Sequence, residues 1–514
     1  MRLAKKVTSR IPWVTTAFLG ELQRILGQPI SHVGTHRQAI EQCLQRLRVA
    51  PEIKGRVAIT ALRNQSWIGV AVYTACVLRQ MGYTSTLLYR GSEVRRFFPA
   101  SLARFDFWKG VAAIPGIELV DLESIEATGA EEAEFTAAAE RAAGSAVAYD
   151  MHLEEDDIVH GDAELLAARD RMVRHMARMA AVLKKTLQRG NYHRLLLYSG
   201  IIAESATMLE CARKLGQETF CLEGWAWRHG HMIANRNAPA LDYDVEGWIR
   251  RIQPWDRVKE QEIDHYINFL DGRYTGGSGW LDNFYSVQRA EISKTLPLGV
   301  REFVSGPEKI FLLAPNVIGD SSMLQRETIF PGQRKWLRAV VEYFRARPHL
   351  KLIIRAHPAE VWVQSKVRVK MAEAAYKIAA GAPNIHVIAA EEKLNTFTLL
   401  PFIHGGLVWL SSAGVDMVVR GIPVISGARP KYTGLGIVEE PASQADYFAV
   451  LERWSVSPPR PTAQQILSAK QYLYVVFKGF SFEAWSKNTY ITGCRLNEMP
   501  NQAEHDAFYR ELVS

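Results

Sequence analysis

Cysteine is scarce in this chain of 514 residues, and its copies are scattered. No two of them form a CxxC pair, the spacing that is typical of zinc knuckles and thiol redox motifs, so the sequence argues against both. An odd number of well separated cysteines indicates reduced thiols, as in a cytosolic protein. The five are Cys43, Cys76, Cys211, Cys221 and Cys494.

Long apolar runs are also missing. No window reaches the about 18 uninterrupted apolar residues that a membrane-spanning helix needs. Residues 1–26 are basic and then apolar, but Glu21, Gln23 and Arg24 interrupt the apolar part and no signal-peptide cleavage site follows. We expect a cytoplasmic protein whose residues 15–26 form an amphipathic helix. That helix either packs on the protein itself or attaches it to the anionic inner face of the cell membrane.

Two familiar phosphate-binding motifs are absent. The chain has no Walker A loop, and no GxGxxG follows its first predicted strand, so kinases, ATPases and dinucleotide-dependent oxidoreductases lack their usual sequence support. The pair His229 and His231 has no third ligand at a suitable spacing, so we expect no metal site. The net charge of +8 suits an anionic partner, but it does not choose among a nucleotide, a polyanionic glycan and a membrane face.

The order of predicted elements indicates an α/β protein with two domains. Residues 55–89 are typical of a strand, a helix and a second strand, which form a β-α-β unit with parallel strands. After a helix-rich stretch over residues 122–186, a second such unit spans residues 193–222. The alternation lapses around residues 250–305 and resumes over residues 309–426. We therefore predict two Rossmann-like, doubly wound domains with a cleft between them.

The predicted domain boundaries follow from this alternation of strands and helices. We assign residues 1–285 to an N-terminal domain with a helical insertion and residues 286–460 to a C-terminal domain. Residues 461–514 are predicted to form helices that pack back on the N-terminal domain. Two doubly wound domains around a cleft occur in GT-B glycosyltransferases, in their epimerase relatives and in some phosphotransferases, so the fold alone does not choose a reaction.

Polar turns follow the apolar strands of the second half, at the sheet edge where ligands bind in open α/β folds. The predicted strands are residues 310–314, 351–355, 386–388, 407–410 and 424–426, and the predicted helices are residues 333–345, 361–380, 395–400 and 415–420. In the first half, the segment 224–237 is predicted as a loop rich in aromatic and polar residues.

Arg355 and His357 come directly after a predicted strand. Pro358 forces an extended or turn conformation on His357. Arginine binds phosphate through two parallel hydrogen bonds, and a histidine held by a turn can donate to a phosphate oxygen or a leaving group. The alternative is a surface turn in which His357 caps the next helix. Because a serine-rich turn follows in the same sheet, we favour the phosphate-binding interpretation.

Ser411 and Ser412 form that serine-rich turn. Together with Gly414 they offer hydroxyl groups and backbone N–H groups at a helix N-terminus, which suits a phosphate. The alternative is an ordinary serine N-cap, and the two roles are compatible. Asp416 lies in the first turn of the same helix, where we expect it either to accept hydrogen bonds from ribose hydroxyl groups or simply to favour the helix dipole.

Further candidates lie at other strand ends. Asn316 and Ser321 follow the first strand of the second domain and are expected to face the cleft. Lys431 belongs to the glycine-rich loop 427–436, which we interpret either as a lid over a nucleotide or as an ordinary turn. Glu223 ends a strand of the first domain, where its carboxylate either serves as base for an acceptor hydroxyl or caps the following loop.

These segments resemble the bacterial capsule polysaccharide synthesis and export family. The resemblance rests on RAHPAE with His357-Pro358, on WLSSAGVDMVVRGIPVI over residues 409–425, and on the pair Glu223-Gly224 after a strand-glycine-helix-strand segment. The similar segments cover residues 193–247 and 309–440. Each motif is short, and their order and spacing carry the resemblance.

Two positions depart from the family pattern, so the donor's identity stays open. Asp416 stands where the family has glutamate, and Pro315-Asn316 stands where it often has Gln-Pro. The resemblance implies a GT-B-like, Kdo-transferase-like glycosyltransferase, cytosolic or peripheral to the membrane. It would move a sugar from a CMP- or UDP-linked donor to a cell-surface polysaccharide or lipid-linked glycan. No metal, no cofactor and no nucleic-acid partner is expected.

In this scheme Glu223 and His357 carry the catalysis, and the other candidates hold the phosphates and the ribose of the donor. The predicted donor-binding set is Asn316, Ser321, Arg355, His357, Ser411, Ser412, Gly414, Asp416 and Lys431. Two alternatives stay open. One is a polyol-phosphate transferase with a CDP-linked donor, because polymerases of wall teichoic acid share the HP and serine-rich features. The other is a non-catalytic protein of the same fold that binds a glycan or scaffolds an export complex.

Overall fold

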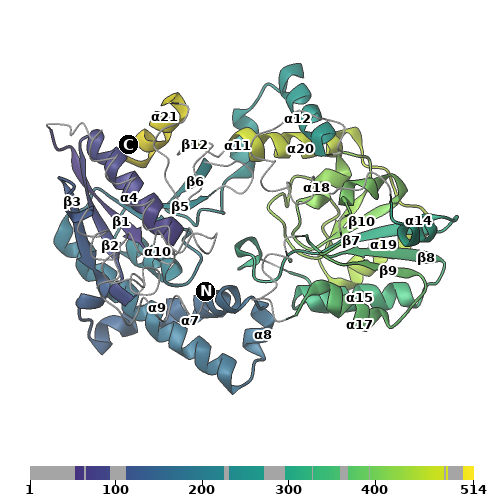
Figure 1. Ribbon diagram of the computed structural model, residues 1–514, viewed down its shortest axis with the longest axis horizontal. Helices are drawn as coiled ribbons and strands as arrows, with labels where there is room; N and C mark the ends of the chain where they lie inside the picture. The colour runs from purple at the N-terminus through teal and green to yellow at the C-terminus, as the bar shows by residue number, and fades with distance from the viewer. Residues whose placement is uncertain are drawn as a thin grey trace, which may run out of the picture. The chain divides into compact units, whose positions relative to one another are not determined.

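The computed structural model describes residues 52–62, 65–92, 111–224, 231–270, 296–326, 328–358, 360, 369–392, 394–479, 482–483 and 502–513. These residues form two compact units, each with its own sheet (Figure 1). The described residues up to 142, those from 172 to 243 and those after 480 belong to unit 1, and the described residues of 143–171 and 244–480 belong to unit 2. These limits differ from the predicted boundaries at residues 285 and 460.

Unit 1 is built on a seven-stranded sheet. Its central strands are parallel, whereas β6 pairs antiparallel with β5, and β12 pairs antiparallel with β6. The central strands β1 (Gly55–Ala61) and β4 (Arg194–Tyr198) are buried along most of their length, as expected where helices cover both faces of a sheet. The sheet order is β12 (Phe482–Glu483), β6 (His231–Arg236), β5 (Thr219–Gly224), β4 (Arg194–Tyr198), β1 (Gly55–Ala61), β2 (Tyr83–Tyr89) and β3 (Ile117–Asp121).

The topology of unit 1 contains a switch point. From β1 the chain proceeds through α4 (Gln65–Gln80) to β2 and then to β3 on one side of the sheet. The strands β4 and β5, joined by α10 (Glu204–Lys214), lie on the other side. The switch therefore falls between β1 and β4. In doubly wound sheets, ligands bind in the crevice at the carboxyl ends of the strands at such a point.

The C-terminal helix α21 (Gln502–Val513) packs in the core of unit 1. Phe508 and Leu512 are fully buried there, and the ring of Tyr509 lies 6.4 Å from the ring of Tyr73 on α4. The preceding helix α20 (Ala463–Tyr474) belongs to unit 2. The two C-terminal helices are thus divided between the units.

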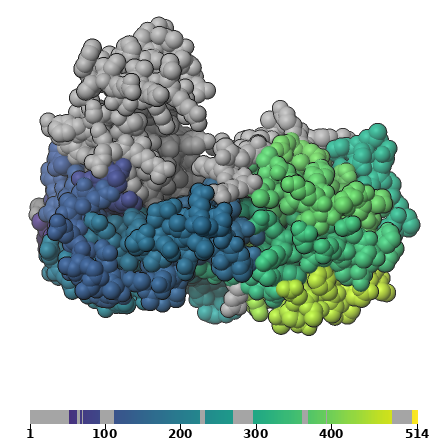
Figure 2. Space-filling model, turned by 90° about the horizontal axis from the view of Figure 1, so that it is seen from below, coloured from purple at the N-terminus to yellow at the C-terminus, as the bar shows by residue number. Residues whose placement is uncertain are grey.

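A helical segment separates β3 from β4. It consists of α7 (Gly129–Met151), α8 (Glu155–Val159) and α9 (Ala163–Gly190), which confirms the helix-rich stretch predicted over residues 122–186. Two ion pairs join α9 to α7, with Lys184 2.6 Å from Glu134 and Lys185 2.8 Å from Glu131. The surface of this segment is seen in blue in Figure 2.

Unit 2 is built on a five-stranded parallel sheet. The chain runs from β7 to β8 and β9 on one side, while β10 and β11 lie on the other, so the switch point falls between β7 and β10. The sheet order is β11 (Val424–Ser426), β10 (Gly405–Val408), β7 (Lys309–Ala314), β8 (Leu350–Arg355) and β9 (Ile385–Ile388).

The helices of unit 2 show how its core is filled. In α15 (Gln333–Arg345), the residues Trp336, Leu337, Val340, Val341 and Phe344 are fully buried, which is the i, i+1, i+4, i+5, i+8 face of an amphipathic helix. The other helices of the unit are α11 (Val245–Arg251), α12 (Arg257–Leu270), α14 (Leu298–Val304), α17 (Met371–Ala379), α18 (Ala413–Val418), α19 (Gln444–Val456) and α20.

Both units are doubly wound α/β folds, which confirms the predicted fold class. The cleft between the domains stays a prediction. Several elements differ from those expected. β3 and α19 were not predicted, part of the predicted loop 224–237 is the strand β6, and residues 395–400 contain short 3-10 turns. In the described part of residues 361–380 the helix begins only at Met371.

Among the described residues, no helix combines the length and the apolar composition needed to cross a membrane. The predicted amphipathic helix over residues 15–26 and His229 lie outside the described residues.

Candidate functional site

A pocket of about 110 Å³ lies at the topological switch point of unit 2. Its walls come from the ends of β7 and β8, from the turn after β10, from the start of α18 and from the 3-10 turns near Phe397. The lining residues are Leu312, Ala314, Pro315, Arg355, His357, Pro358, Thr396, Phe397, Leu400, Ser411, Ser412, Ala413, Asp416 and Met417. The structure therefore brings together five of the predicted site residues in one crevice.

His357 is half-buried in the turn that follows β8, where its carbonyl accepts a hydrogen bond of 3.0 Å from the backbone N–H of Glu360. Burial lowers the pKa of the imidazole below its ordinary value; the charge of Asp320 opposes this effect and that of Arg355 adds to it. The ring is therefore neutral near pH 7. A neutral imidazole carries one N–H donor and one acceptor nitrogen, which suits a contact with a phosphate oxygen.

Arg355 is buried and holds the loop after β9. Its Nη1 donates to the carbonyl of Ala389, and its Nη2 donates to the carbonyls of Glu392 at 3.1 Å and Leu394 at 3.2 Å. Burial lowers its pKa to about 10, which leaves it charged at neutral pH. Both terminal nitrogens are thus used by the fold, rather than by the two-pronged phosphate contact that we predicted. The Nε atom is buried and has no hydrogen-bond partner among the described residues.

The serine-rich turn combines capping with a packing constraint. The hydroxyl of Ser411 accepts from the backbone N–H of Ala413 at 3.2 Å, so Ser411 acts as a cap, while Ser412 makes no side-chain cap. The carbonyl of Ser411 accepts from the buried hydroxyl of Tyr432 at 2.7 Å. A Cβ atom on Gly414 would lie 2.6 Å from that hydroxyl oxygen, so glycine is required here by the approach of Tyr432.

Asp416 is buried in the first turn of α18 and lines the pocket. The Nη1 atom of Arg420 lies 3.8 Å from its Oδ1 and donates to its carbonyl at 2.6 Å. The guanidinium of Arg420 also lies over the ring of Phe397, 4.6 Å from its centroid. A cation therefore lies beside this carboxylate on the pocket wall.

Four predicted donor-binding residues are not among those that line the pocket, namely Gly414, Asn316, Ser321 and Lys431. Asn316 joins two strand ends, because its Oδ1 accepts from the N–H of Leu410 at 2.9 Å and its backbone makes two hydrogen bonds with Gln333. Ser321 begins a short 3-10 turn. Lys431 is half-buried in the loop 427–436.

The loop 427–436 is fastened to unit 2. Within this loop the side chain of Tyr432 is buried, and the N–H of Gly434 donates to Glu440 at 3.0 Å. Arg429 lies 3.6 Å from Glu440 as well. These contacts favour the interpretation of the loop as an ordinary turn over its interpretation as a lid.

Glu223 ends β5 at the carboxyl edge of the sheet of unit 1. Its Oε2 accepts a hydrogen bond of 3.0 Å from the hydroxyl of Ser199, which follows β4. Ser199 has a φ of +56°, and Ala203 has a φ of +44°, so the turn between β4 and α10 is in a conformation that L-residues rarely adopt. Backbone strain of this kind concentrates at functional sites.

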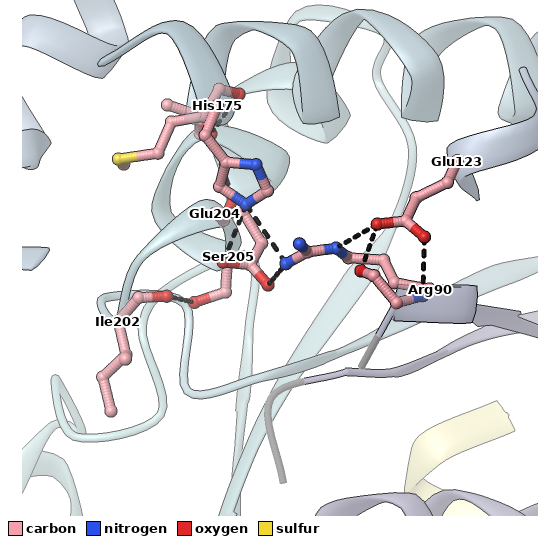
Figure 3. A network of polar contacts seen from close by, with 9 residues as sticks. Arg90, Glu123, His175, Ile202, Glu204 and Ser205 are labelled. Carbon is pink, nitrogen blue, oxygen red and sulfur yellow. Dashed lines mark hydrogen bonds and ion pairs between the residues drawn. The ribbon is translucent and has the colours of Figure 1, made fainter. Parts of the chain in front are cut away.

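A buried polar network adjoins this turn (Figure 3). Arg90, after β2, lies between Glu123, at 3.5 Å, and Glu204 at the start of α10, at 3.9 Å. His175 on α9 lies 3.3 Å from Arg90 and 3.6 Å from Glu204, whose side chain is almost fully buried. Burial opposes ionisation of Glu123, but hydrogen bonds from Ser92 and the charge of Arg90 outweigh it and lower its pKa.

Sequence reasoning did not select this network. One usable indication existed, because Arg90 and Glu204 both follow strands of the parallel sheet closely, and polar residues at that edge are candidates for function. His175 lies on a long amphipathic helix, and nothing in the local sequence indicates that it joins this network. Among the described residues, no group of three or more histidine, cysteine, aspartate or glutamate side chains is arranged to hold a metal ion.

Comparison with known proteins agrees with the sequence motifs. Residues 263–454 match the sequence model of a family described as capsule polysaccharide biosynthesis protein, which confirms the predicted resemblance over that part of the chain. A search of curated proteins finds no match.

Several solved structures are similar at low sequence identity. The beta Kdo 2,7 transferase of Thermosulfurimonas dismutans KpsC is 13% identical, with 65% of this chain and 88% of that chain covered and a TM-score of 0.37. The beta Kdo 2,4 transferase of the same KpsC is 15% identical, with 62% and 87% covered and a TM-score of 0.35. The UDP-GlcNAc 2-epimerase of Neisseria meningitidis bound to UDP-GlcNAc is 11% identical, with 82% and 98% covered and a TM-score of 0.24.

Proposed function

We propose that this chain, which matches the capsule polysaccharide biosynthesis family over residues 263–454, is a glycosyltransferase. It would transfer a sugar from a nucleotide-activated donor, CMP- or UDP-linked, to a cell-surface polysaccharide or glycolipid. One observation carries the proposal: the pocket at the switch point of unit 2 gathers His357, Ser411, Ser412 and Asp416, and it lies within the matched segment.

The chemistry assigns a role to each pocket group. The bond between the anomeric carbon and the donor phosphate oxygen breaks, and the leaving phosphate keeps the electron pair. The neutral His357 would donate its N–H to that phosphate, together with the serine hydroxyls. Asp416 would accept from the ribose hydroxyls. Donors fixed in place before the reaction lower its barrier without rearranging in the transition state.

The acceptor side of the proposal rests on Glu223. The acceptor oxygen forms the new bond to the anomeric carbon and passes its proton to the carboxylate of Glu223. The hydroxyl of Ser199, 3.0 Å from Glu223, would hold that carboxylate in one orientation. In this scheme the reaction needs no metal ion.

Nucleotide binding tests the proposal most directly. A ligand that binds only the folded protein raises its melting temperature, and at about 100 times Kd the added stability is about 2.7 kcal/mol. We expect CMP or UDP, but not inorganic phosphate alone, to raise the melting temperature of the wild-type protein. If none of CMP, CDP, UDP and GDP shifts the melting curve, the chain is better explained as a non-catalytic member of the fold.

Product analysis then separates the reactions. We expect mass spectrometry to show a sugar added to a glycan acceptor from a CMP- or UDP-linked sugar. Addition of a polyol phosphate from a CDP-linked donor would instead identify a polyol-phosphate transferase.

A further inference from the structure

The segment 143–171 lies far in the sequence from the rest of unit 2, yet it belongs to that unit. Figure 2 shows its blue atoms against the green atoms of unit 2. The approach is close: a Cβ atom on Gly319 would lie 2.7 Å from the Cα of His152. Gly319 belongs to the loop that follows β7, and this loop also carries Asp320, which acts on the pKa of His357. The segment therefore packs on the loop that follows β7, and the first residue of that loop, Pro315, lines the pocket.

Glu154 is the most buried acid of this segment and caps the N-terminus of α15. Its Oε1 accepts from the backbone N–H of Arg334 at 3.0 Å, and its Oε2 lies 3.5 Å from Nε of Arg334. A Cβ atom on Gly332 would lie 2.6 Å from Oε2 of Glu154. A side chain at position 332 would therefore collide with the Glu154 carboxylate. An acid at this position satisfies an N–H group that the helix itself cannot pair.

The acids that follow Glu154 bind the same region. Asp157 pairs with Arg334, and Asp156 lies 2.9 Å from Nζ of Lys335. Glu155 accepts from the N–H of Gln325 at 3.1 Å and from the hydroxyl of Ser145 at 2.6 Å. Four consecutive acids thus fix one turn of α15 and the loop before it.

A chain of hydrogen bonds leads from this turn into the pocket. Gln333, the neighbour of Arg334, accepts from the N–H of Asn316 at 2.7 Å and donates to its carbonyl at 3.0 Å. The Oδ1 atom of Asn316 accepts from the N–H of Leu410 at 2.9 Å. Leu410 precedes Ser411, which lines the pocket. Each of these is a half-buried hydrogen bond between a backbone group and the side chain of Gln333 or Asn316.

We propose that Glu154 is a positioning residue for the candidate site: it holds the first turn of α15, so that Gln333 and Asn316 fix the backbone at Leu410 and Ser411. The consequence for nucleotide affinity rests on the proposed function. The consequence for the ligand-free pocket does not. A segment from the N-terminal half of the chain thereby sets the geometry of a site in the C-terminal half.

The test compares Glu154→Ala with Glu154→Gln and with Glu164→Ala, an exposed acid of the same segment. Hydrogen exchange of the ligand-free protein is followed over residues 405–416, and affinity for CMP and UDP is measured by calorimetry. We expect Glu154→Ala to speed exchange over residues 405–416 about tenfold and to weaken nucleotide binding by a similar factor. Glu154→Gln keeps an acceptor for the N–H of Arg334, so we expect a smaller effect, and Glu164→Ala should change neither quantity.

Faster exchange over residues 330–336 with unchanged exchange over residues 405–416 would overturn the proposal, because Glu154 would then stabilise α15 only. Should Glu154→Ala fail to fold, Asn316→Ala cuts the chain of hydrogen bonds nearer the pocket. We expect it to speed exchange over residues 405–416 but not over residues 330–336, and the absence of that effect would equally overturn the proposal. If the wild-type protein binds no nucleotide, the proposed function fails, while the exchange data still decide the role of Glu154.

Discussion

At the scale of single residues, the site depends on groups whose charge is set by burial. His357 is kept neutral, Arg355 is buried against backbone carbonyls, and Asp416 is balanced by Arg420. These states follow from the surroundings of each side chain, because desolvation penalises the charged form and a nearby opposite charge favours it. Substitutions at these positions therefore change chemistry or stability in directions that can be stated in advance.

His357→Ala is expected to reduce turnover at least about 100-fold, the usual contribution of a positioned proton donor, while the fold stays intact. The matched control is His349→Ala, because His349 is exposed in the same unit. Initial rates with a CMP- or UDP-linked sugar and thermal unfolding of each variant check the expectation. Unchanged turnover in a folded His357→Ala protein would remove His357 from the mechanism.

Glu360→Gln tests the effect of burial on a carboxyl group beside the site. Glu360 is 1% exposed, and burial, helped by Glu391 and opposed by the N–H of Met371 and by Lys370, raises its pKa from 4.5 to about 7. Because the folded-state pKa is the higher one, the stability contributed by the protonated group is complete below pH 4.5 and is lost as the pH rises through 7.

We therefore expect Glu360→Gln to raise the free energy of unfolding at pH 8 by about 1–3 kcal/mol and to leave it nearly unchanged at pH 4.5. Urea unfolding across that pH range measures the effect, and Glu342→Gln, at an exposed acid on α15, serves as the control. A wild-type protein whose stability relative to Glu360→Gln does not change with pH would contradict the raised pKa.

At the scale of elements, the short helix α18 is placed by a contact from outside the helix. The hydroxyl of Tyr432 bonds the carbonyl of Ser411 and fills the space in which Gly414 would carry a Cβ atom. The turn after β10 therefore requires glycine at position 414, because a side chain there would collide with Tyr432. A substitution at Gly414 would change the pocket by changing the orientation of Ser411 and Ser412.

Gly414→Ala is expected to lower the free energy of unfolding by about 1–3 kcal/mol, because overpacking moves Tyr432 or the helix. Tyr432→Phe removes the oxygen that the new methyl group would meet. The double variant should therefore lose less stability than the sum of the two single variants, and chemical unfolding of all four proteins gives the coupling. If the losses of stability in the two single variants are strictly additive in the double variant, the clash of the new methyl group is relieved by groups other than the Tyr432 hydroxyl.

At the scale of the whole molecule, the chain builds two units from interleaved segments. Unit 1 takes its final core residues from α21, and unit 2 takes the segment 143–171, which runs from within α7 through α8 to within α9. Each unit therefore includes segments that are distant in sequence from the rest of it. This arrangement predicts that a substitution in the buried face of α21 destabilises unit 1.

Phe508→Ala is expected to destabilise unit 1 by about 3–5 kcal/mol, since the side chain is fully buried in its core. Hydrogen exchange should accelerate in β1 and α4 and change little in β7 and β8. The control Val456→Ala, at a residue that is 76% exposed in unit 2, should accelerate neither set. Equal acceleration in both sheets would mean that the two units unfold together.

The sequence by itself determined the strands and helices with a regular apolar pattern and the sheet edge at which the site lies. β1, β4, β7, β8, β11 and α15 were predicted from apolar runs, helical periodicity and turn residues, because those local patterns are the direct cause of the elements. The positions of His357, Ser411 and Asp416 after strands also followed, since parallel strands end at one edge.

Only the tertiary structure decided how each polar side chain is used. Arg355 binds loop carbonyls, Asn316 braces two strand ends, and Glu154 caps a helix that lies 180 positions further along the chain. A hydrogen bond depends on distances between groups that local sequence does not bring together. The strand β6 was missed for the same reason, because its pairing partner β5, rather than its own pattern, makes it a strand.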